Sequence, residues 1–307
     1  MSKFFEALER AETEGAVRTT ASSPRRTVDV SASPAPEAPS VEVPPAAPPR
    51  FPRSVAEAPS KATKREVDRA DRVEACLVSL LDPRSFEAEQ YRVLRHVVET
   101  LRKDANLQVV AVTSPGVGDG KTTTAINLAG ALAQSVDARV LLVDIDIRRP
   151  AVARQLGLAG SRRSLVDMLL DASLTLDDAV EHLAHFNLSV LPAGGPAVAP
   201  YEVLKSLRLE ALLGEARQCY DYIVLDTPPF VPVPDCRVIA KCVDGFLTVV
   251  KAHRTPRGEL AQTLDLMDPG KVTGLVFNGD NTRRSGYYDT YVAAPRGARW
   301  RLPWRKP

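Results

Sequence analysis

The chain contains 307 residues, and its 40 lysines and arginines against 38 aspartates and glutamates give a formal net charge of +2. This near-neutral balance argues against a nucleic-acid-binding protein, whereas the 44% hydrophobic content suits a globular core. No apolar run approaches the ~20 residues that a membrane-spanning helix needs. The length allows one α/β domain with additional segments.

Cysteine usage and the N-terminus indicate the compartment. The four cysteines have no C-x-x-C spacing, and no apolar stretch of the signal-peptide type follows Met1. We therefore expect free thiols in a reducing compartment and a cytoplasmic protein. The expected organisation is a short amphipathic helix over 1–14, a disordered Pro/Ala/Ser-rich linker over 15–75, a folded domain over 76–285 and a tail over 286–307.

The folded domain is expected to begin with an amphipathic helix over residues 85–102. Glu89, Arg92 and Arg95 are spaced by three residues and share one flank of this helix. Two interpretations stay open. The flank is either a solvated face with an intrahelical ion pair, which stabilises the helix little, or a docking face for another subunit.

Residues 107–123 predict a phosphate-binding loop. A valine-rich strand pattern leads into a glycine-studded turn and then into a helix that begins at Lys121. Backbone N–H groups of such a turn bind phosphate, Lys121 reaches the β- and γ-phosphates, and Thr122 offers its hydroxyl to Mg²⁺. Pro115 replaces the first glycine of the strict motif, so a turn that binds nothing is the alternative. The expected nucleotide contacts are Ser114, Gly116, Gly118, Asp119, Gly120, Lys121, Thr122, Thr123 and, at the end of the last expected strand, Asn278.

Two later strands end in acidic residues. Asp144 and Asp146 follow the strand pattern 138–143, and Asp226 ends a buried strand of the Walker B type. The carboxyl ends of parallel strands share one edge of a sheet, so these acids should lie near the phosphates. Alternation places Asp144 and Asp146 on one side, where one can hold the Mg²⁺ water shell and the other can accept a proton from an attacking hydroxyl. The catalytic candidates are therefore Lys121, Asp144 and Asp146, and the metal candidates are Thr122, Asp144 and Asp226.

Strand and helix patterns alternate through the rest of the domain. Residues 151–186 and 200–217 are expected to be mainly helical, and Asp235 is expected to cap a further helix. Further strands are expected at 188–191, 246–250 and 274–277. This alternation predicts an α/β domain of the P-loop NTPase type, with a parallel sheet sandwiched by helices.

Three stretches together, residues 113–123, 143–150 and 225–229, resemble the bacterial protein-tyrosine kinases of capsule and exopolysaccharide biosynthesis. These kinases lie within the deviant Walker A ATPases, which include plasmid-partition proteins. The resemblance implies an ATP-dependent protein-tyrosine autokinase, with ATP and Mg²⁺, that regulates polysaccharide polymerisation and export. Glu89, Arg92 and Arg95 coincide with the family motif Glu-x-x-Arg-x-x-Arg, which implies a ring-like homo-oligomer.

The resemblance also implies that tail tyrosines are phosphorylated by a neighbouring subunit, and here the candidates are Tyr287, Tyr288 and Tyr291. It implies a separate transmembrane chain-length regulator as activator, and a peripheral position at the inner membrane. Basic residues interleaved with tryptophan over 296–307 suit an anionic membrane surface, and no nucleic acid is expected. The alternative is a regulatory ATPase switch of the partition type that acts with a membrane partner, its tyrosines being incidental.

Overall fold

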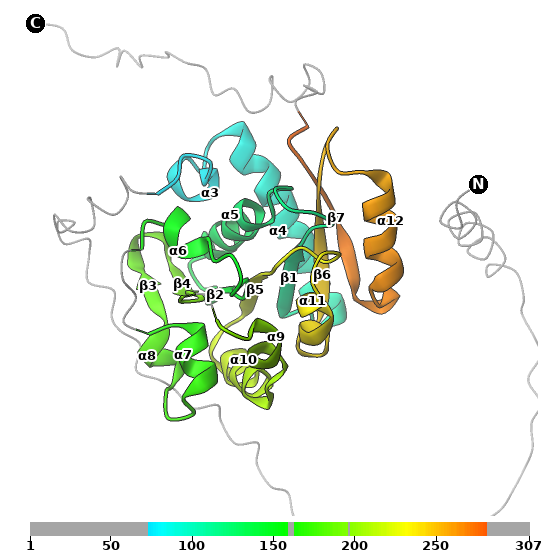
Figure 1. Ribbon diagram of the computed structural model, residues 1–307. Coiled ribbons are helices and arrows are strands. Elements are labelled where there is room, and N and C mark those ends of the chain that lie inside the picture. Colours follow the sequence, from blue (N-terminus) through cyan, green and yellow to red (C-terminus); the bar gives the residue numbers. More distant parts are fainter. Residues whose placement is uncertain (1–72, 159–162, 196, 281–307) are drawn as a thin grey trace, which may run out of the picture. The chain divides into compact units, whose positions relative to one another are not determined.

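The computed structural model describes residues 73–280, apart from 159–162 and residue 196. The expected segments 1–14 and 286–307, and nearly all of 15–75, lie outside the described residues and stay predictions. The described part is built on a seven-stranded sheet in the order β3-β4-β2-β5-β1-β6-β7 (Figure 1). The strands are β1 (Val109–Thr113), β2 (Val140–Asp144), β3 (Glu181–Leu183), β4 (Leu188–Leu191), β5 (Tyr222–Asp226), β6 (Gly245–Lys251) and β7 (Val272–Asn278).

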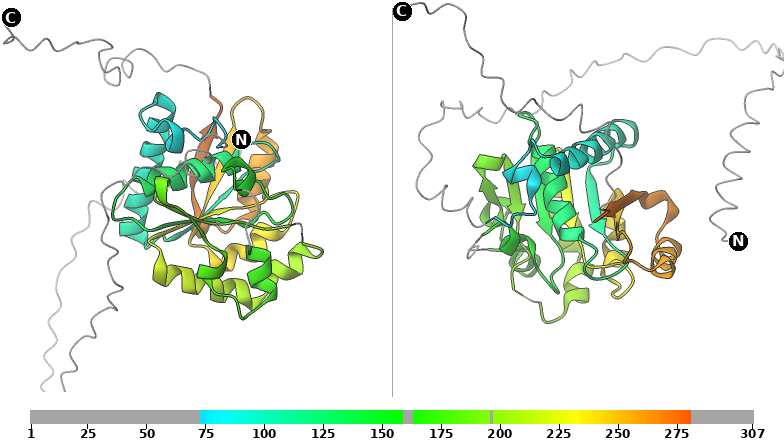
Figure 2. Two further views of the ribbon diagram at one scale, coloured as in Figure 1. Left: turned by 90° about the vertical axis from the view of Figure 1, so that its left-hand side faces the viewer. Right: turned by 90° about the horizontal axis from the view of Figure 1, so that it is seen from above.

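Helices cover both faces of this sheet (Figure 2). Every residue of β1, β2 and β4 is buried, as expected for parallel strands that pack against helices on both sides. One core cluster lies under α3 to α6 and the other under α7 to α11. These helices are α3 (Val78–Leu81), α4 (Phe86–Ala105), α5 (Lys121–Ala133), α6 (Val152–Gln155), α7 (Leu165–Leu170), α8 (Leu176–Ala179), α9 (Pro200–Lys205), α10 (Leu207–Cys219) and α11 (Asp235–Ile239), and α12 (Arg257–Leu266) precedes β7.

The ends of α4 follow from its sequence. Ser85 caps the helix by accepting a hydrogen bond from the Ala88 N–H at 3.1 Å, and Glu87 and Glu89 place negative charge in the first turn. Asn106 ends the helix in the left-handed region at φ 54°, where asparagine costs less than most residues. The predicted helix over 85–102 is thus observed at nearly the same bounds.

The structure differs from the sequence predictions in four places. Strand β3 runs antiparallel to β4, and its three residues are too short to show an alternating pattern. The segment 151–186 holds several short helices, and the helix expected over 200–217 is divided at Ser206, which has extended backbone angles. Asp235 does not cap α11: Pro234 occupies the N-cap position, and Asp235 is the first helical residue.

The strand order decides where the site forms. β5 lies between β1 and β2, so the loop after β1, the acid that ends β5 and the acid that ends β2 meet at one edge. Asp144 and Asp226 are direct partners in the register of β2 and β5. β6 pairs with β1 on its other side, so the loop after β6 reaches the phosphate-binding loop from the opposite direction. The predicted fold class is confirmed, with the addition of one antiparallel edge strand.

Candidate active site

The loop between β1 and α5 has the backbone shape of a phosphate cradle. Gly118 and Gly120 take positive φ angles of 87° and 96°, which residues with a Cβ adopt only with strain. Within the loop, Ser114 Oγ donates to the Gly116 carbonyl at 2.7 Å, and the Gly116 N–H donates to Asp119 Oδ2 at 3.1 Å. Helix α5 begins at Lys121, so its positive end faces the loop.

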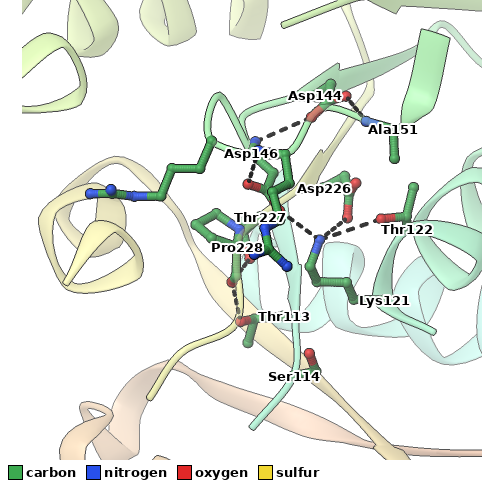
Figure 3. Close-up of polar contacts among 12 residues, drawn as sticks. Thr113, Ser114, Lys121, Thr122, Asp144, Asp146, Ala151, Asp226, Thr227 and Pro228 are labelled. Carbon is green, nitrogen blue, oxygen red and sulfur yellow. Dashed lines mark hydrogen bonds and ion pairs between the residues drawn. The ribbon is translucent and has the colours of Figure 1, made fainter. Parts of the chain in front are cut away.

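Lys121 extends from the first turn of α5 between two carboxylates (Figure 3). Its Nζ lies 2.9 Å from Asp146 Oδ2 and 3.6 Å from Asp226 Oδ1. Burial by itself lowers the pKa of this amine, but the charges of Asp226, Asp146 and Asp144 outweigh it, and the net pKa is raised. Lys121 is therefore a fixed positive charge at the entrance of the phosphate cradle.

Asp226 is the most deeply buried acid of the site. Its side chain is fully buried, and neither carboxylate oxygen has a hydrogen-bond donor among the described residues beyond the ion pair with Lys121. Burial raises the pKa of Asp226 to about 6, although Lys121 opposes the rise. A buried carboxylate with free lone pairs is an incomplete arrangement, which a cation or its bound water would complete.

Asp144 ends β2 and Asp146 lies two residues later, and their carboxylates have different hydrogen-bond partners. Asp144 accepts three backbone N–H groups: Asp146 on Oδ1 at 3.2 Å, and Ala151 and Val152 on Oδ2 at 3.0 Å each. Burial and the charge of Asp226 nevertheless raise the pKa of Asp144 to about 7. Asp144 thus organises the turn 145–151, while Asp146 presents its carboxylate to Lys121.

The comparisons with known proteins agree with this geometry. Residues 107–252 match a family described as "AAA domain". The chain is 32% identical to the tyrosine-protein kinase YwqD of Bacillus subtilis over 228 residues, which cover 73% of this chain and 95% of YwqD. The solved kinase domain of the Escherichia coli tyrosine kinase ETK superposes with a TM-score of 0.63 at 25% identity, over 69% of this chain and 83% of that domain.

The chain belongs to the bacterial tyrosine-protein kinase family. The predicted family and the predicted enzyme class, a protein-tyrosine kinase, are confirmed. A second relative shares 32% identity over 221 residues: the succinoglycan biosynthesis transport protein ExoP of Rhizobium meliloti. The match covers 70% of this chain and 28% of ExoP, so most of ExoP has no counterpart in the matched segment.

The site of this tyrosine-protein kinase family member fits a nucleotide with a divalent cation. No group of three metal-ligating side chains occurs in the part of the chain that the structure describes. Mg²⁺ at phosphate sites usually takes one or two protein ligands and completes its shell with phosphate and water. Thr122, whose buried hydroxyl lies 3.4 Å from Lys121 Nζ, and Asp226, with its unbonded carboxylate oxygens, provide such a small set.

Two predicted nucleotide contacts, Asn278 and Asp119, also make hydrogen bonds that hold the loop in shape. Asn278, the last residue of β7, donates from Nδ2 to the Asp119 carbonyl at 2.9 Å. A Cβ on Gly120 would lie 2.0 Å from that Nδ2 atom, so glycine is required where the amide passes beneath the loop. Asp119 turns its carboxylate away from the cradle, to the Gly116 N–H and the Thr255 hydroxyl.

Three residues of the site were missed by the sequence predictions. Thr255, in the loop after β6, donates from Oγ1 to Asp119 Oδ1 at 2.8 Å. Arg148, in the turn after β2, makes a two-point ion pair with the fully buried Asp235 at 2.6 and 2.9 Å. Arg148 stands in the acidic motif and could have been considered, whereas its partner is 87 positions away and carries no local signal.

The three residues of the predicted oligomerisation motif lie on different sides of α4. Glu89 and Arg92 form an ion pair on the partly exposed surface of α4, and Arg92 also donates to the Pro83 carbonyl. Arg95 lies against the core side: it pairs with Glu99 at 2.6 Å and donates to the Ala131 carbonyl of α5 at 2.9 Å. Arg95 therefore fastens α4 to α5 within one chain.

None of the helices among the described residues is long and apolar enough to cross a membrane. The candidate phosphoacceptors Tyr287, Tyr288 and Tyr291 lie outside the described residues.

Proposed function

We propose that the chain is an ATP-dependent protein-tyrosine autokinase that acts in capsule or exopolysaccharide assembly. The observation that carries this proposal is the position of Lys121, a half-buried cation held between Asp146 and Asp226 next to the glycine loop. Such a site stabilises the negative charge of a phosphoryl group in transfer, which is the main task of phosphoryl-transfer enzymes.

The residues divide the chemistry as follows. The N–H groups of the loop 116–122 and the charge of Lys121 bind and orient the phosphates. Thr122 and Asp226 would hold Mg²⁺, which neutralises phosphate charge when it is bound. Asp146, which is buried beside Lys121 in the turn after β2, accepts the proton of the attacking tyrosine hydroxyl. Asp144 keeps this turn in place through its three backbone hydrogen bonds.

The outward face of α4 supports the proposal of a homo-oligomer. Phe86, Val93 and Val97 lie on one stripe of this helix and are 48%, 59% and 43% exposed, and Glu89 flanks the stripe. Three exposed apolar side chains in line are the pattern of a helix-mediated contact. We infer that a second copy of the chain binds this stripe.

The name of ExoP supports the link to polysaccharide. ExoP is described as a succinoglycan biosynthesis transport protein, and its matched segment is only 28% of its length. We propose that this chain acts with a separate transmembrane chain-length regulator. Peripheral attachment to an anionic membrane through the basic tail belongs to the same proposal.

Phosphorylation of the purified full chain tests the autokinase proposal. After incubation with Mg·ATP, mass spectrometry should find phosphate on Tyr287, Tyr288 or Tyr291. The triple variant Tyr287→Phe, Tyr288→Phe, Tyr291→Phe should keep ATP hydrolysis and lose that phosphate. ATP hydrolysis without phosphate on any tyrosine of the wild type would instead establish the regulatory ATPase switch. Phosphate confined to other tyrosines would overturn the choice of acceptors but keep the kinase.

A further inference from the structure

The two edges of the sheet differ in how well they are protected. At one edge, β3 has three residues and includes a charged residue, Glu181, so it offers little surface for another strand. At the other edge, β7 is seven residues long, with the sequence Val-Thr-Gly-Leu-Val-Phe-Asn. It has no proline and no charge, which are the features that normally prevent an edge strand from pairing.

The side chains of β7 also indicate a missing neighbour. Phe277 is 66% exposed and Leu275 is 37% exposed, and both point to the same face because they are two positions apart. Within the described residues, β6 is the only strand that pairs with β7, so its outer N–H and C=O groups have no strand partner. Figures 1 and 2 show β7 in orange at the margin of the sheet, beyond β6.

The chain itself continues directly from this edge. Gly279, with φ 72°, follows the last residue of β7 and can start a reversal of direction. Seven residues, 279–285, then separate β7 from the stretch Gly-Tyr-Tyr-Asp-Thr-Tyr-Val at 286–292, which lies outside the described residues. Aromatic and β-branched residues dominate that stretch, as in strands, and a loop of this length closes at modest entropic cost.

We propose that residues 286–292 dock on the outer edge of β7 as an antiparallel strand of the same chain. Side chains alternate along a strand, so Tyr287 and Tyr291 lie on one face of the segment and Tyr288 lies on the other. Whichever face is on the side of Phe277, it therefore carries at least one tyrosine. Aromatic cross-strand pairs are among the favourable pairs of antiparallel sheets. The docked segment thereby covers the exposed apolar side chains Leu275 and Phe277.

Charge supports the same direction of docking. An antiparallel strand returns toward the start of β7, where the exposed Asp265 and Asp268 lie at the end of α12 and just before the strand. The segment that follows is basic, with Arg296, Arg299, Arg301, Arg305 and Lys306. The basic end of the tail would therefore be brought near these two aspartates.

The docked strand holds its three tyrosines away from any phosphate-binding loop. This control of phosphorylation rests on the proposed autokinase activity, whereas the docking of the segment does not. A tyrosine must leave β7 before it can enter a neighbouring site, so the number of free tails limits phosphorylation in trans.

Hydrogen exchange of the full chain without nucleotide tests the docking independently of any kinase activity. The amides of β7 that point away from β6 and the amides of residues 286–292 should both be protected in the wild type. The double variant Thr290→Pro, Tyr291→Pro should lose both protections, with exchange roughly tenfold faster. Adjacent N–H groups of a strand point to opposite sides, so the two prolines remove a donor to β7 in any register. The matched control Gly297→Pro, Ala298→Pro should exchange like the wild type.

A second variant addresses the strand that receives the segment. Phe277→Ala removes an exposed side chain, so it should keep the melting temperature while residues 286–292 lose protection. Equal exchange in the wild type, the double proline variant and Phe277→Ala would overturn the proposal. Protection that rises with protein concentration would also overturn it, because the occupant of the edge would then be a second copy.

Discussion

Two segments reach the phosphate-binding loop from opposite sides, and they contribute different kinds of interaction. The turn 145–151, after β2, brings buried charge: Asp146 contacts Lys121, and Asp144 is tied to the backbone of the turn. The segment 252–256, after β6, brings a hydroxyl, because Thr255 bonds the carboxylate of Asp119, and it also places the Arg254 guanidinium beside Gly118. The first segment places charge where phosphate chemistry occurs, and the second maintains the shape of the loop. Changes on the first side should therefore affect the rate most, and changes on the second side should affect mainly nucleotide affinity.

The largest effect is expected from Lys121→Met, which removes the cation from the charged side. Phosphoryl transfer should fall by about 10³-fold or more, because the charge developing on the phosphoryl group loses its nearest positive side chain. Phosphotyrosine formed per minute with Mg·ATP measures the effect. Lys241→Met, which removes a surface cation paired with Glu210, is the matched control and should keep the wild-type rate. A near-normal rate in Lys121→Met would refute the assignment of the phosphate site.

Asp146→Asn and Asp144→Asn should separate proton transfer from support of the turn. Asp146→Asn should lower the transfer rate by about 10²–10³-fold with a smaller loss of nucleotide affinity, because it removes the proton acceptor. Asp144→Asn places an amide nitrogen among backbone N–H donors, so nucleotide affinity, rate and stability should all fall. Single-turnover rates together with nucleotide titrations distinguish the two. The roles are exchanged if Asp144→Asn alone loses rate with its affinity intact.

The buried charge also predicts a pH dependence of stability. Burial raises the pKa of Asp226 to about 6, whereas an aspartate in the unfolded chain titrates near 3.9. Between these values the folded state binds more protons than the unfolded state, so the free energy of unfolding of the nucleotide-free protein falls as pH rises. Asp226→Asn removes this decrease in the free energy of unfolding. Above pH 7 the inactive variant should therefore be more stable than the wild type by about 1–3 kcal/mol.

Urea unfolding at about pH 4.5 and 7.5 measures this difference. Asp221→Asn is the control, because it should change the free energy of unfolding in the opposite direction. Burial raises the pKa of Asp221, but hydrogen bonds and charge from Arg139 outweigh burial, and the net pKa is lowered. Its replacement should therefore cost stability above pH 4. If both variants lost stability at pH 7.5, the account of Asp226 as a destabilised buried acid would be wrong.

The smallest effect is expected from Thr255→Val, in the segment after β6. The variant keeps the shape of the side chain and loses the hydrogen bond to Asp119, worth about 1 kcal/mol. Nucleotide affinity should fall by a few-fold, while the transfer rate at saturating ATP stays unchanged. Nucleotide titration and the saturated rate together check this. A large loss of the saturated rate would show that this side also takes part in the chemistry.

Local patterns predicted most of the fold and the charged half of the site. The buried strands, the glycine turn and the acids at strand ends are each contained within a few consecutive residues, and the edge where they meet follows from parallel strands. The half of the site that the segment after β6 supplies could not be predicted in this way, because Thr255 and Asp119 are 136 positions apart. The pair of Arg148 with Asp235 is similar, and the expectation of a helix cap at Asp235 was wrong because a distant arginine binds its carboxylate.

On the ribosome, the glycine loop of this chain emerges long before the residue that supports it from below. Asn278 is synthesised 159 positions after Asp119, as the last residue of β7. A nascent chain that has reached only β6 lacks the amide that bonds the Asp119 carbonyl. Since one such hydrogen bond is worth about 1 kcal/mol, nucleotide should bind a few-fold more weakly until translation has passed β7. Bound nucleotide stabilises only the folded state, so it should stabilise the finished domain more than the nascent one.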